Sequence, residues 1–211
     1  MKKLLLLISC SFCFVAGFAQ LKAITENGDE VFLYDDGSWT LVGDPAPYEF
    51  ETLELNPKAF EKDSKSSFLL KSNRTNMGIW LDPKKWTFKK AEVNSEAEYE
   101  FQLKDGDLYG MLISERVAIP LETLRGIALE NGRSVAPDLH IDKEEYRTVN
   151  GLKMLFLQMS GTMQGIKFSY YGYYYTNDNG TVQFVTYTAQ NLLEEYIPEC
   201  ELLLGGLVEN I

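Results

Sequence analysis

The chain is poor in cysteine and histidine, and these shortages exclude several kinds of site. Of its three cysteines, Cys10 and Cys13 lie in the apolar N-terminal segment. Once that segment is removed, Cys200 has no other cysteine in the chain with which to form a disulfide. His140 is the only histidine, and a Ser-His-Asp triad, a Cys-His pair or most zinc sites would have to use it. The sequence also has no G-x-S-x-G motif, phosphate loop or dinucleotide fingerprint. It therefore indicates no catalytic residue, no metal site and no cofactor.

Basic residues are also scarce. The chain has 20 lysine and arginine residues against 31 aspartate and glutamate residues, a net charge of −11. Removal of residues 1–19, which hold two lysines and no acidic residue, leaves 18 against 31, a net charge of −13. Such a surface repels nucleic acid phosphates and anionic lipid headgroups, and it suits a soluble exported domain. We therefore expect no nucleic acid partner.

Residues 1–19 have the organisation of a secretory signal peptide. Two lysines precede an apolar run that ends at Phe18, and small residues then place the cleavage site between Ala19 and Gln20. The run is shorter than the roughly 20 apolar residues that a spanning helix needs, so we expect no transmembrane segment in the mature chain. Lipid attachment at Cys10 is the rival interpretation, but only the short stretch 4–8 precedes that cysteine. We predict export to the periplasm or the outside, with lipid anchoring less favoured.

Turn residues divide the next segment into short strands. Strands are expected at 22–25, 31–34 and 38–42, with Asn27-Gly28 and Asp35-Asp36-Gly37 as turns between them. This predicts a small β-meander in residues 20–42, and it resembles a hairpin common near the start of exported bacterial proteins of unknown function. Proline residues and alternating charges predict a linker in residues 43–67. Because so small a meander is marginally stable alone, we expect it to dock on another surface.

Residues 68–211 are predicted to form the main domain. Short strands are expected at 77–81, 86–89, 98–103 and 109–119, followed by a helix over 121–130 that stops at Asn131-Gly132, and a polar loop over 134–143. Longer strands follow at 153–160, 165–175 and 181–188, and then a terminal helix that Pro198 kinks or splits. The order predicts an α+β fold, with an antiparallel sheet and two main helices packed on it.

Several residues of this domain carry a resemblance to a known fold. They are Gly78, Trp80, Pro83 and Trp86, the Asn150-Gly151 turn, the strand at 165–170 and the exit at 186–189. Over residues 68–208 the pattern resembles the PsbP-like fold, a family that also includes a Ran-binding nuclear import factor. The resemblance implies an antiparallel sheet with helices on its faces. It also implies a non-catalytic assembly or binding role, and it transfers no binding residue.

The tyrosine-rich strand is the most conspicuous candidate for a binding surface. Alternation along a strand places Tyr171, Tyr173 and Tyr175 on one face, with Tyr170 and Tyr174 on the other. The first face could be a stacking platform for a glycan, a peptide or a protein partner, because aromatic residues are enriched at interfaces. Alternatively both faces are covered, one by helix 121–130 and one by the terminal helix or the meander, which also suits tyrosine. Tyr171, Tyr173 and Tyr175 are therefore the candidate binding residues.

Two further residues have a functional and a structural interpretation. His140 shares a strand face with Asp138 and Asp142, which could orient an imidazole but equally suits a solvated sheet edge. Cys200 falls on the apolar face of the last helix, where a buried cysteine behaves as a small hydrophobic residue. The acidic clusters fall at predicted turns, so turn chemistry explains them.

Three functions remain open. The first is an exported, non-catalytic binding or assembly-accessory protein of the bacterial cell envelope, whose partner is an unidentified protein or envelope component. The alternative is a carboxylate-dependent hydrolase that acts on glycans or peptides, which requires two acidic side chains in a cleft and a raised pKa on at least one. The third is a lipid-anchored surface protein. Whether the chain is an enzyme stays open, and the first function is favoured.

Overall fold

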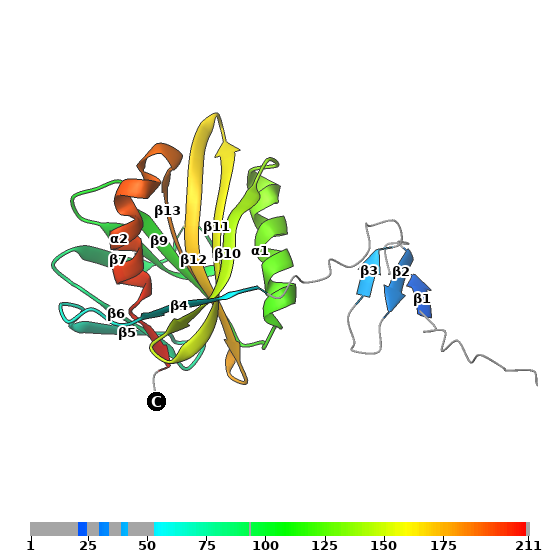
Figure 1. Ribbon diagram of the computed structural model, residues 1–211, viewed down its shortest axis with the longest axis horizontal. Coiled ribbons are helices and arrows are strands. Elements are labelled where there is room, and N and C mark those ends of the chain that lie inside the picture. The colour runs from blue at the N-terminus through cyan, green and yellow to red at the C-terminus, as the bar shows by residue number, and fades with distance from the viewer. Residues whose placement is uncertain (1–20, 25–29, 34–38, 42–52, 93, 210–211) are drawn as a thin grey trace, which may run out of the picture. The chain divides into compact units, whose positions relative to one another are not determined.

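The computed structural model describes residues 21–24, 30–33, 39–41, 53–92 and 94–209 (Figure 1). The chain divides into two compact units, Met1–Glu51 and Thr52–Ile211. In the first unit, β1 (Leu21–Ile24), β2 (Glu30–Leu33) and β3 (Trp39–Leu41) form an antiparallel sheet in the order β1-β2-β3. The strands follow one another as in the predicted meander.

In its described residues, the second unit contains one large sheet, one small sheet and two α-helices. Its strands are β4 (Leu55–Phe60), β5 (Phe68–Lys71), β6 (Met77–Leu81), β7 (Trp86–Lys90), β8 (Ala97–Leu103), β9 (Tyr109–Glu115), β10 (His140–Val149), β11 (Leu152–Met163), β12 (Ile166–Asn177), β13 (Gly180–Ala189) and β14 (Leu207–Glu209). Its helices are α1 (Leu121–Val135), the short 3₁₀ helix η1 (Gln190–Leu192) and α2 (Leu193–Leu204). The large sheet has the order β4-β10-β11-β12-β13-β9-β8-β7, and the small sheet has the order β14-β6-β5.

Two-residue turns set the register of the longest strands. Asn150 and Gly151 join β10 to β11, with φ angles of 48° and 83°. Gln164 and Gly165 join β11 to β12, with φ angles of 52° and 81°. Two consecutive positive φ angles are the signature of the type I′ turn, whose twist matches that of a β-hairpin. The turns thus fix which side chains of β10, β11 and β12 lie beside one another.

The large sheet is mixed, which corrects the prediction of a purely antiparallel sheet. β4 pairs with β10 in parallel, with Thr148 opposite Ala59 and Val149 opposite Phe60. β4 also lies inside the range 43–67 that the sequence predicted as a linker, and Phe60 is buried. Residues 55–60 lack a regular alternation, since Pro57 interrupts them, and a partner far along the chain holds them in the sheet. A local pattern therefore could not reveal this strand.

The two helices cover opposite faces of the large sheet (Figure 1). α2 packs on the face that carries Tyr171 and Tyr173, together with the small sheet, in one core cluster. α1 packs on the face that carries Phe168 and Tyr174, in a second cluster. Both faces of the tyrosine-rich strand are therefore covered, which is one of the two interpretations that the sequence left open.

The end of one helix and the start of one strand differ from the prediction. α1 continues through the expected stop at Gly132 to Val135, and β10 begins at His140, inside the predicted loop. A Cβ atom at Gly132 would lie 2.2 Å from a methyl group of Leu139, so this glycine allows the helix to pack closely against the following loop. α2 continues through Pro198 and is not split.

Candidate functional site

Arg147 forms the centre of a polar cluster on the α2 face of the large sheet. It lies on β10 and is 3% exposed, which is unusual for a charged side chain. Its guanidinium carbon lies 3.6 Å from the ring centre of Phe156 and 4.6 Å from that of Phe60. Rings at these distances attract a cation through their negative faces. β4, β10 and β11 thus enclose one positive charge between aromatic side chains.

The polar partners of Arg147 come from two strands. Its Nε donates a hydrogen bond to Glu145 at 2.6 Å, and its Nη1 donates to the hydroxyl of Tyr171 at 2.9 Å and to that of Tyr173 at 3.4 Å. The hydroxyl of Tyr171 in turn donates to Glu201 of α2 at 3.1 Å. Since a buried charge is tolerated only when it is paired and hydrogen-bonded, these contacts explain how Arg147 stays inside the domain.

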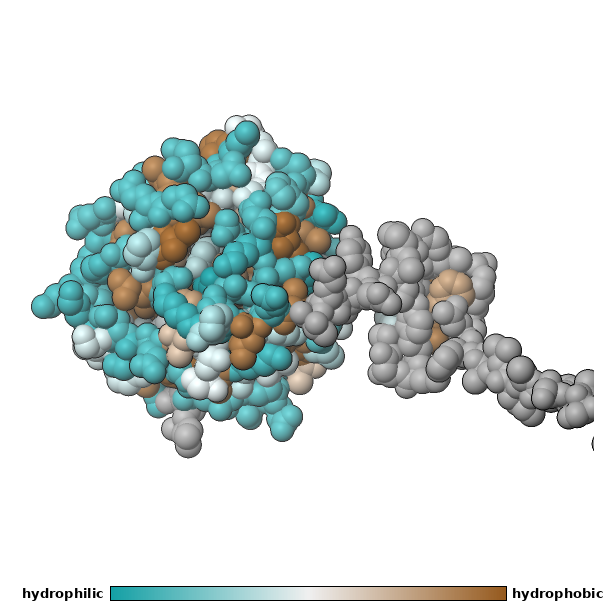
Figure 2. Space-filling view, in the orientation of Figure 1, coloured by the Kyte–Doolittle hydropathy of each residue, from teal (hydrophilic) through white to brown (hydrophobic). Residues whose placement is uncertain are grey.

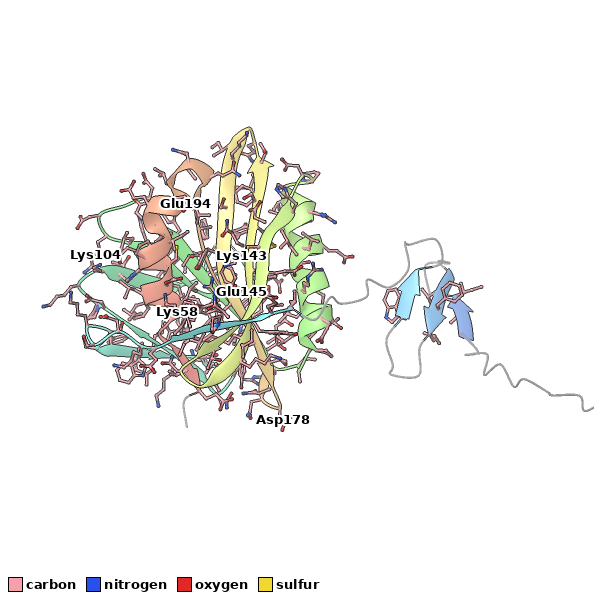
Figure 3. All side chains as sticks on the ribbon, viewed as in Figure 1. Lys58, Lys104, Lys143, Glu145, Asp178 and Glu194 are labelled. Atoms are coloured by element: carbon pink, nitrogen blue, oxygen red, sulfur yellow. The ribbon has the colours of Figure 1, made fainter. Side chains whose placement is uncertain are left out.

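An outer layer of polar residues surrounds this centre. Asn56 of β4 donates to Glu145 at 2.9 Å, and Lys143 lies 3.2 Å from the same carboxylate. Lys58 of β4 lies 2.9 Å from Glu201. Figure 3 shows Lys58, Lys143 and Glu145 in the region between α2 and β10. We call Arg147, Glu145, Glu201, Tyr171 and Tyr173 the Arg147 cluster.

Burial and hydrogen bonding shift the pKa values of this cluster in a consistent way. Burial raises the pKa of Tyr173 to about 12, against the lowering effect of Arg147. The pKa of Arg147 lies above its ordinary value, because the hydroxyls of Tyr173 and Tyr171 outweigh the lowering effect of burial. For Glu145, burial raises the pKa, but hydrogen bonds from Asn56 and Arg147 lower it further, and the net shift is downward. Near neutral pH Tyr173, Arg147 and Glu145 therefore each keep one protonation state, and none of these three is a proton donor or acceptor tuned for catalysis.

The structure places Tyr171 and Tyr173 in the core and not on the surface. They are 3% and 0% exposed, so their rings are not available to stack on a glycan or a peptide, which corrects the platform interpretation for these two residues. Tyr175 is only half-buried, and its hydroxyl donates to Glu209 at 2.8 Å. The predicted cleavage residues, Ala19 and Gln20, lie outside the described residues.

His140 is a largely exposed residue at the start of β10. Its Nδ1 lies 3.0 Å from the carbonyl oxygen of Asp138, and its Nε2 lies 3.2 Å from a carboxylate oxygen of Asp142. The other oxygen of Asp142 accepts a hydrogen bond from Ser160, whose hydroxyl lies 3.1 Å from that of Ser169. The aspartate stands between the histidine and the serine, so the imidazole cannot take the serine proton directly. This geometry differs from a catalytic triad, in which the histidine is the middle residue.

Cys200 lies where the sequence predicted it, on the buried side of α2. It is 0% exposed, and burial raises the pKa of its thiol to about 11. Because the thiolate is the reactive form, this cysteine is held in its unreactive state. It therefore packs as a small hydrophobic residue.

The structure tests the carboxylates that a hydrolase would need. Among the described residues, three carboxyl groups have a shifted pKa, and hydrogen bonds lower it in Glu98, Asp138 and Glu145 alike. For Glu98 the hydrogen bonds come from Asn73 and Ser72 and outweigh the raising effect of burial. A general acid at neutral pH needs the opposite shift, so none of the three suits that role.

A small cavity opens beside α2, with a volume of about 60 Å³. It is lined by the loop before β5, the turn between β6 and β7, and Glu199, Leu202 and Leu203 of α2. Sites for small molecules usually enclose about 300–1,000 Å³, so this cavity has room for a few waters or a single side chain. On the face seen in Figure 2, apolar residues form small separate groups among hydrophilic ones.

Two further observations concern metal binding and membrane crossing. Within the described ranges, no three side chains of histidine, cysteine, aspartate or glutamate are grouped so that they could hold a metal ion. Neither described α-helix combines the length and the apolarity that crossing a membrane requires.

Sequence reasoning did not find the Arg147 cluster. The alternation Lys143, Glu145, Arg147 was available as a sign that three charges share one strand face. The other members come from β12 and α2, and the surrounding layer from β4 includes Asn56, 91 positions before Arg147, so the long-range register of the sheet brings them together. The sequence shows which of these residues are charged or aromatic, but it does not show that they lie close together.

Comparison with known proteins gives the fold and no activity. The sequence matches no protein-family model and no curated protein. Among solved structures, it is similar to the solution structure of cyanobacterial PsbP (CyanoP) from Synechocystis, with a TM-score of 0.53 and 9% identity over 70% of this chain and 94% of that one. A Pseudomonas aeruginosa protein of unknown function, described as a putative regulator, matches with a TM-score of 0.44 and 11% identity, over 68% of this chain and 97% of that one. LpqN of Mycobacterium tuberculosis, described as involved in cell envelope biogenesis, matches with a TM-score of 0.37 and 10% identity, over 74% of this chain and 88% of that one. The likeness to cyanobacterial PsbP shows that the chain has a PsbP-like α+β fold, as its sequence pattern predicted.

Proposed function

We propose that this chain is an exported accessory protein of the bacterial cell envelope that binds a partner and does not catalyse a reaction. The observation that supports it most is the closure of the Arg147 cluster. Its cation, both tyrosine hydroxyls and both glutamates already have partners within the chain. A catalytic site must leave a reactive group free to meet its substrate, and this cluster has every group engaged.

The proposed organisation begins with export. Residues 1–19 act as a signal peptide that is removed between Ala19 and Gln20, and a β-meander and the PsbP-like domain follow. In this proposal the domain starts near residue 55, because β4 belongs to its sheet. The mass of the mature protein recovered from expressing cells tests this step. A chain that begins at Gln20 supports it, whereas a lipid on Cys10 would favour the anchored form.

Tyr175 is the tyrosine that we assign to partner contact. It stays half-exposed beside Glu209, whereas Tyr171 and Tyr173 lie behind it in the core and contribute by holding the strand. The mature chain would be immobilised and exposed to envelope extract. The proteins that it retains would be compared with those retained by Tyr175→Ala and by Tyr109→Ala. Tyr109 is a matched control, since it is half-buried and stacked on another tyrosine, Tyr187, at 5.6 Å. A specific partner that only Tyr175→Ala loses supports the assignment, and equal retention by both variants contradicts it.

The hydrolase alternative has its own assay. The mature chain would be incubated with peptidoglycan fragments and with a peptide mixture, beside Glu145→Gln and Glu201→Gln. We expect no turnover by any of the three, because both carboxylates are bound to groups of the chain itself. Turnover by the wild type that either variant abolishes would replace the binding proposal by a catalytic one.

A further inference from the structure

Basic residues are concentrated in one part of this acidic chain. Residues 62–90 contain eight lysine or arginine residues and two acidic residues, although the whole chain has a net charge of −11. This segment contains β5, β6 and β7, which Figure 1 shows together at the left of the main domain. Lys85 and Lys89 of this segment already pair with glutamates outside it. The net charge of the chain thus conceals a segment with an excess of basic residues, and those left without an acidic partner favour acidic ligands.

Two exposed phenylalanine rings lie within this positive region. Phe68 of β5 is 42% exposed and Phe88 of β7 is 38% exposed. Their ring centres are 5.3 Å apart in a stacked arrangement, and Phe88 also meets the ring of Tyr99 edge-on at 6.4 Å. Stacking on each other and on a buried tyrosine holds both rings in place. They therefore form a fixed apolar surface whose ordering costs little entropy when a partner binds.

Two exposed lysines belong to this part of the domain, and Lys90 shares a strand face with Phe88, two residues before it on β7. Lys90 is the register partner of Tyr99, and the hydroxyl of Tyr99 donates a hydrogen bond to the carbonyl oxygen of Lys71 at 3.2 Å. Both lysine side chains are exposed, and neither takes part in an ion pair among the described residues. Their charges are therefore available to a partner. We call Phe68, Lys71, Phe88 and Lys90 the β7 surface.

The β7 surface borders an open strand edge. β7 ends the order of the large sheet, and within the described ranges it pairs with β8 alone. An edge strand presents backbone N–H and C=O groups that an added strand can use. Lysine on such an edge discourages pairing with a second copy, since like charges repel, but it favours an acidic strand.

We propose that the β7 surface binds an extended acidic segment of a protein partner, which adds to the edge of β7 and places apolar side chains on Phe68 and Phe88. This inference rests on the proposed binding function and gives its partner a chemistry. Successive side chains of an added strand alternate between its two faces. Phe88 and Lys90 are two positions apart on β7 and share one face, so a segment in which an acidic and an apolar residue are also two positions apart fits the lysine and the rings together.

A protein segment suits this surface better than an anionic bilayer. The two rings lie on strands and cover each other, whereas membrane-inserting side chains need to reach several ångströms beyond the surface. A bilayer would also meet a whole side of a domain that is acidic, with 17 basic and 23 acidic residues in positions 52–211. An extended segment touches only the strip along β7, where the local charge is positive.

A peptide selection on the purified mature chain tests the proposal. A library of short random peptides would be selected on the wild type, and the binders measured on Lys71→Glu/Lys90→Glu, on Phe88→Ser and on Lys167→Glu. Lys167 is a matched control, because it is exposed on β12, outside this region. We expect peptides in which acidic and apolar residues are two positions apart, amide shifts in β7, and an affinity about tenfold lower in the double variant, from two lost charge contacts. Circular dichroism would confirm that each variant is folded.

Each other outcome contradicts the proposal in a distinguishable way. Selected peptides without acidic residues, or binding that survives the double variant, would place recognition elsewhere. If no peptide were selected, the proposal would fail, and the lysines would serve only to prevent the β7 edge from pairing with a second copy. If the wild type bound phosphatidylglycerol vesicles and the double variant did not, a lipid surface would be the partner. If an envelope protein is retained by both the wild type and the double variant, the binding function stands and only this surface is wrong.

Discussion

The two faces of the large sheet are closed in different ways, although the same strands supply both. On the α1 face, Leu124 and Ala128 of the helix and Leu155 and Leu157 of β11 belong to one apolar cluster. At its partly exposed rim, Arg125 of α1 forms an ion pair with Glu144 of β10. On the α2 face, apolar packing surrounds a buried cation, Arg147, and its hydrogen-bonded partners. The arginine on the α1 face thus lies at a partly exposed rim, with 21% of its side chain exposed, whereas the arginine on the α2 face is buried at the centre of the packing, with 4% exposed.

The difference indicates separate roles for the two faces. Apolar contact has no preferred direction, and it stabilises roughly in proportion to the area that is buried. A buried ion network is directional, since each partner must stand at hydrogen-bonding distance. On the α2 face the network joins β4 and α2 to the sheet through Glu145 and Glu201. We infer that the α1 face contributes mainly stability, and that the α2 face also fixes the positions of β4 and α2.

The largest expected effect is the loss of Arg147. In Arg147→Met the carboxylate of Glu145 and the hydroxyls of Tyr171 and Tyr173 lose their shared cation inside the domain. Breaking a buried ion pair on one side costs about 3–5 kcal/mol, so we expect the free energy of unfolding to fall by about 4 kcal/mol. Urea denaturation followed by circular dichroism measures it.

The double variant Arg147→Met/Glu145→Gln is the control for this prediction. Most of the cost arises from the carboxylate left without its cation, so neutralising Glu145 should recover part of the loss. A single variant that loses less than about 1 kcal/mol would mean that the cluster behaves like a surface ion pair.

On the other face, Leu124→Ala should cost less. Leu124 is fully buried between α1 and the sheet, and removing three carbon atoms there leaves a cavity. Leucine to alanine changes in cores cost about 2–5 kcal/mol, and we expect about 3 kcal/mol by the same urea measurement. Combined with Arg147→Met, the losses should add within about 0.5 kcal/mol, because the faces share no partners. Strong coupling between the two variants would contradict the separation of roles.

The pH dependence of stability should distinguish the faces next. The pKa of Glu145 is lowered in the folded chain, so its contribution is present above the unfolded value near 4.5 and is lost as pH falls through the folded value. Unfolding measured from pH 7 downward should show stability falling below about pH 5. The fall should be shallower in Glu145→Gln, while Leu124→Ala keeps the slope of the wild type. Glu98 and Asp138 contribute in the same direction, so the slope should not vanish.

The parts of the fold that follow from local pattern were predictable from the sequence. The long strands around 153–188 and the Asn150-Gly151 turn were found because alternation and turn chemistry depend on neighbours along the chain. The faces of the tyrosine-rich strand were assigned correctly for the same reason. Which element covers each face depends on tertiary packing, and the sequence left that open.

The parts that depend on distant contacts were not predictable. β4 was read as a linker because Pro57 breaks its pattern, and its place in the sheet comes from β10, some 90 residues later. The Arg147 cluster requires three elements, β10, β12 and α2, to be correctly placed at once. The positive segment around β7 was countable in the sequence, but the net charge of the whole chain obscured it. The net charge of a chain does not show how charge is distributed along it, and a local sequence pattern does not show which distant segments pair.

The smallest effect is expected at the rim of the Arg147 cluster, where Lys58 meets Glu201 at 2.9 Å. The lysine side chain is 60% exposed, so water screens the pair, and Lys58→Met should cost only about 0.5 kcal/mol of global stability. If the network positions β4, however, the backbone amides of β4 should exchange hydrogen faster in this variant than in the wild type at low salt. An edge strand opens more easily when a contact is lost. High salt should erase the difference between variant and wild type, because ions weaken an exposed pair. Unchanged exchange in β4 would confine the positioning role to the buried centre around Arg147.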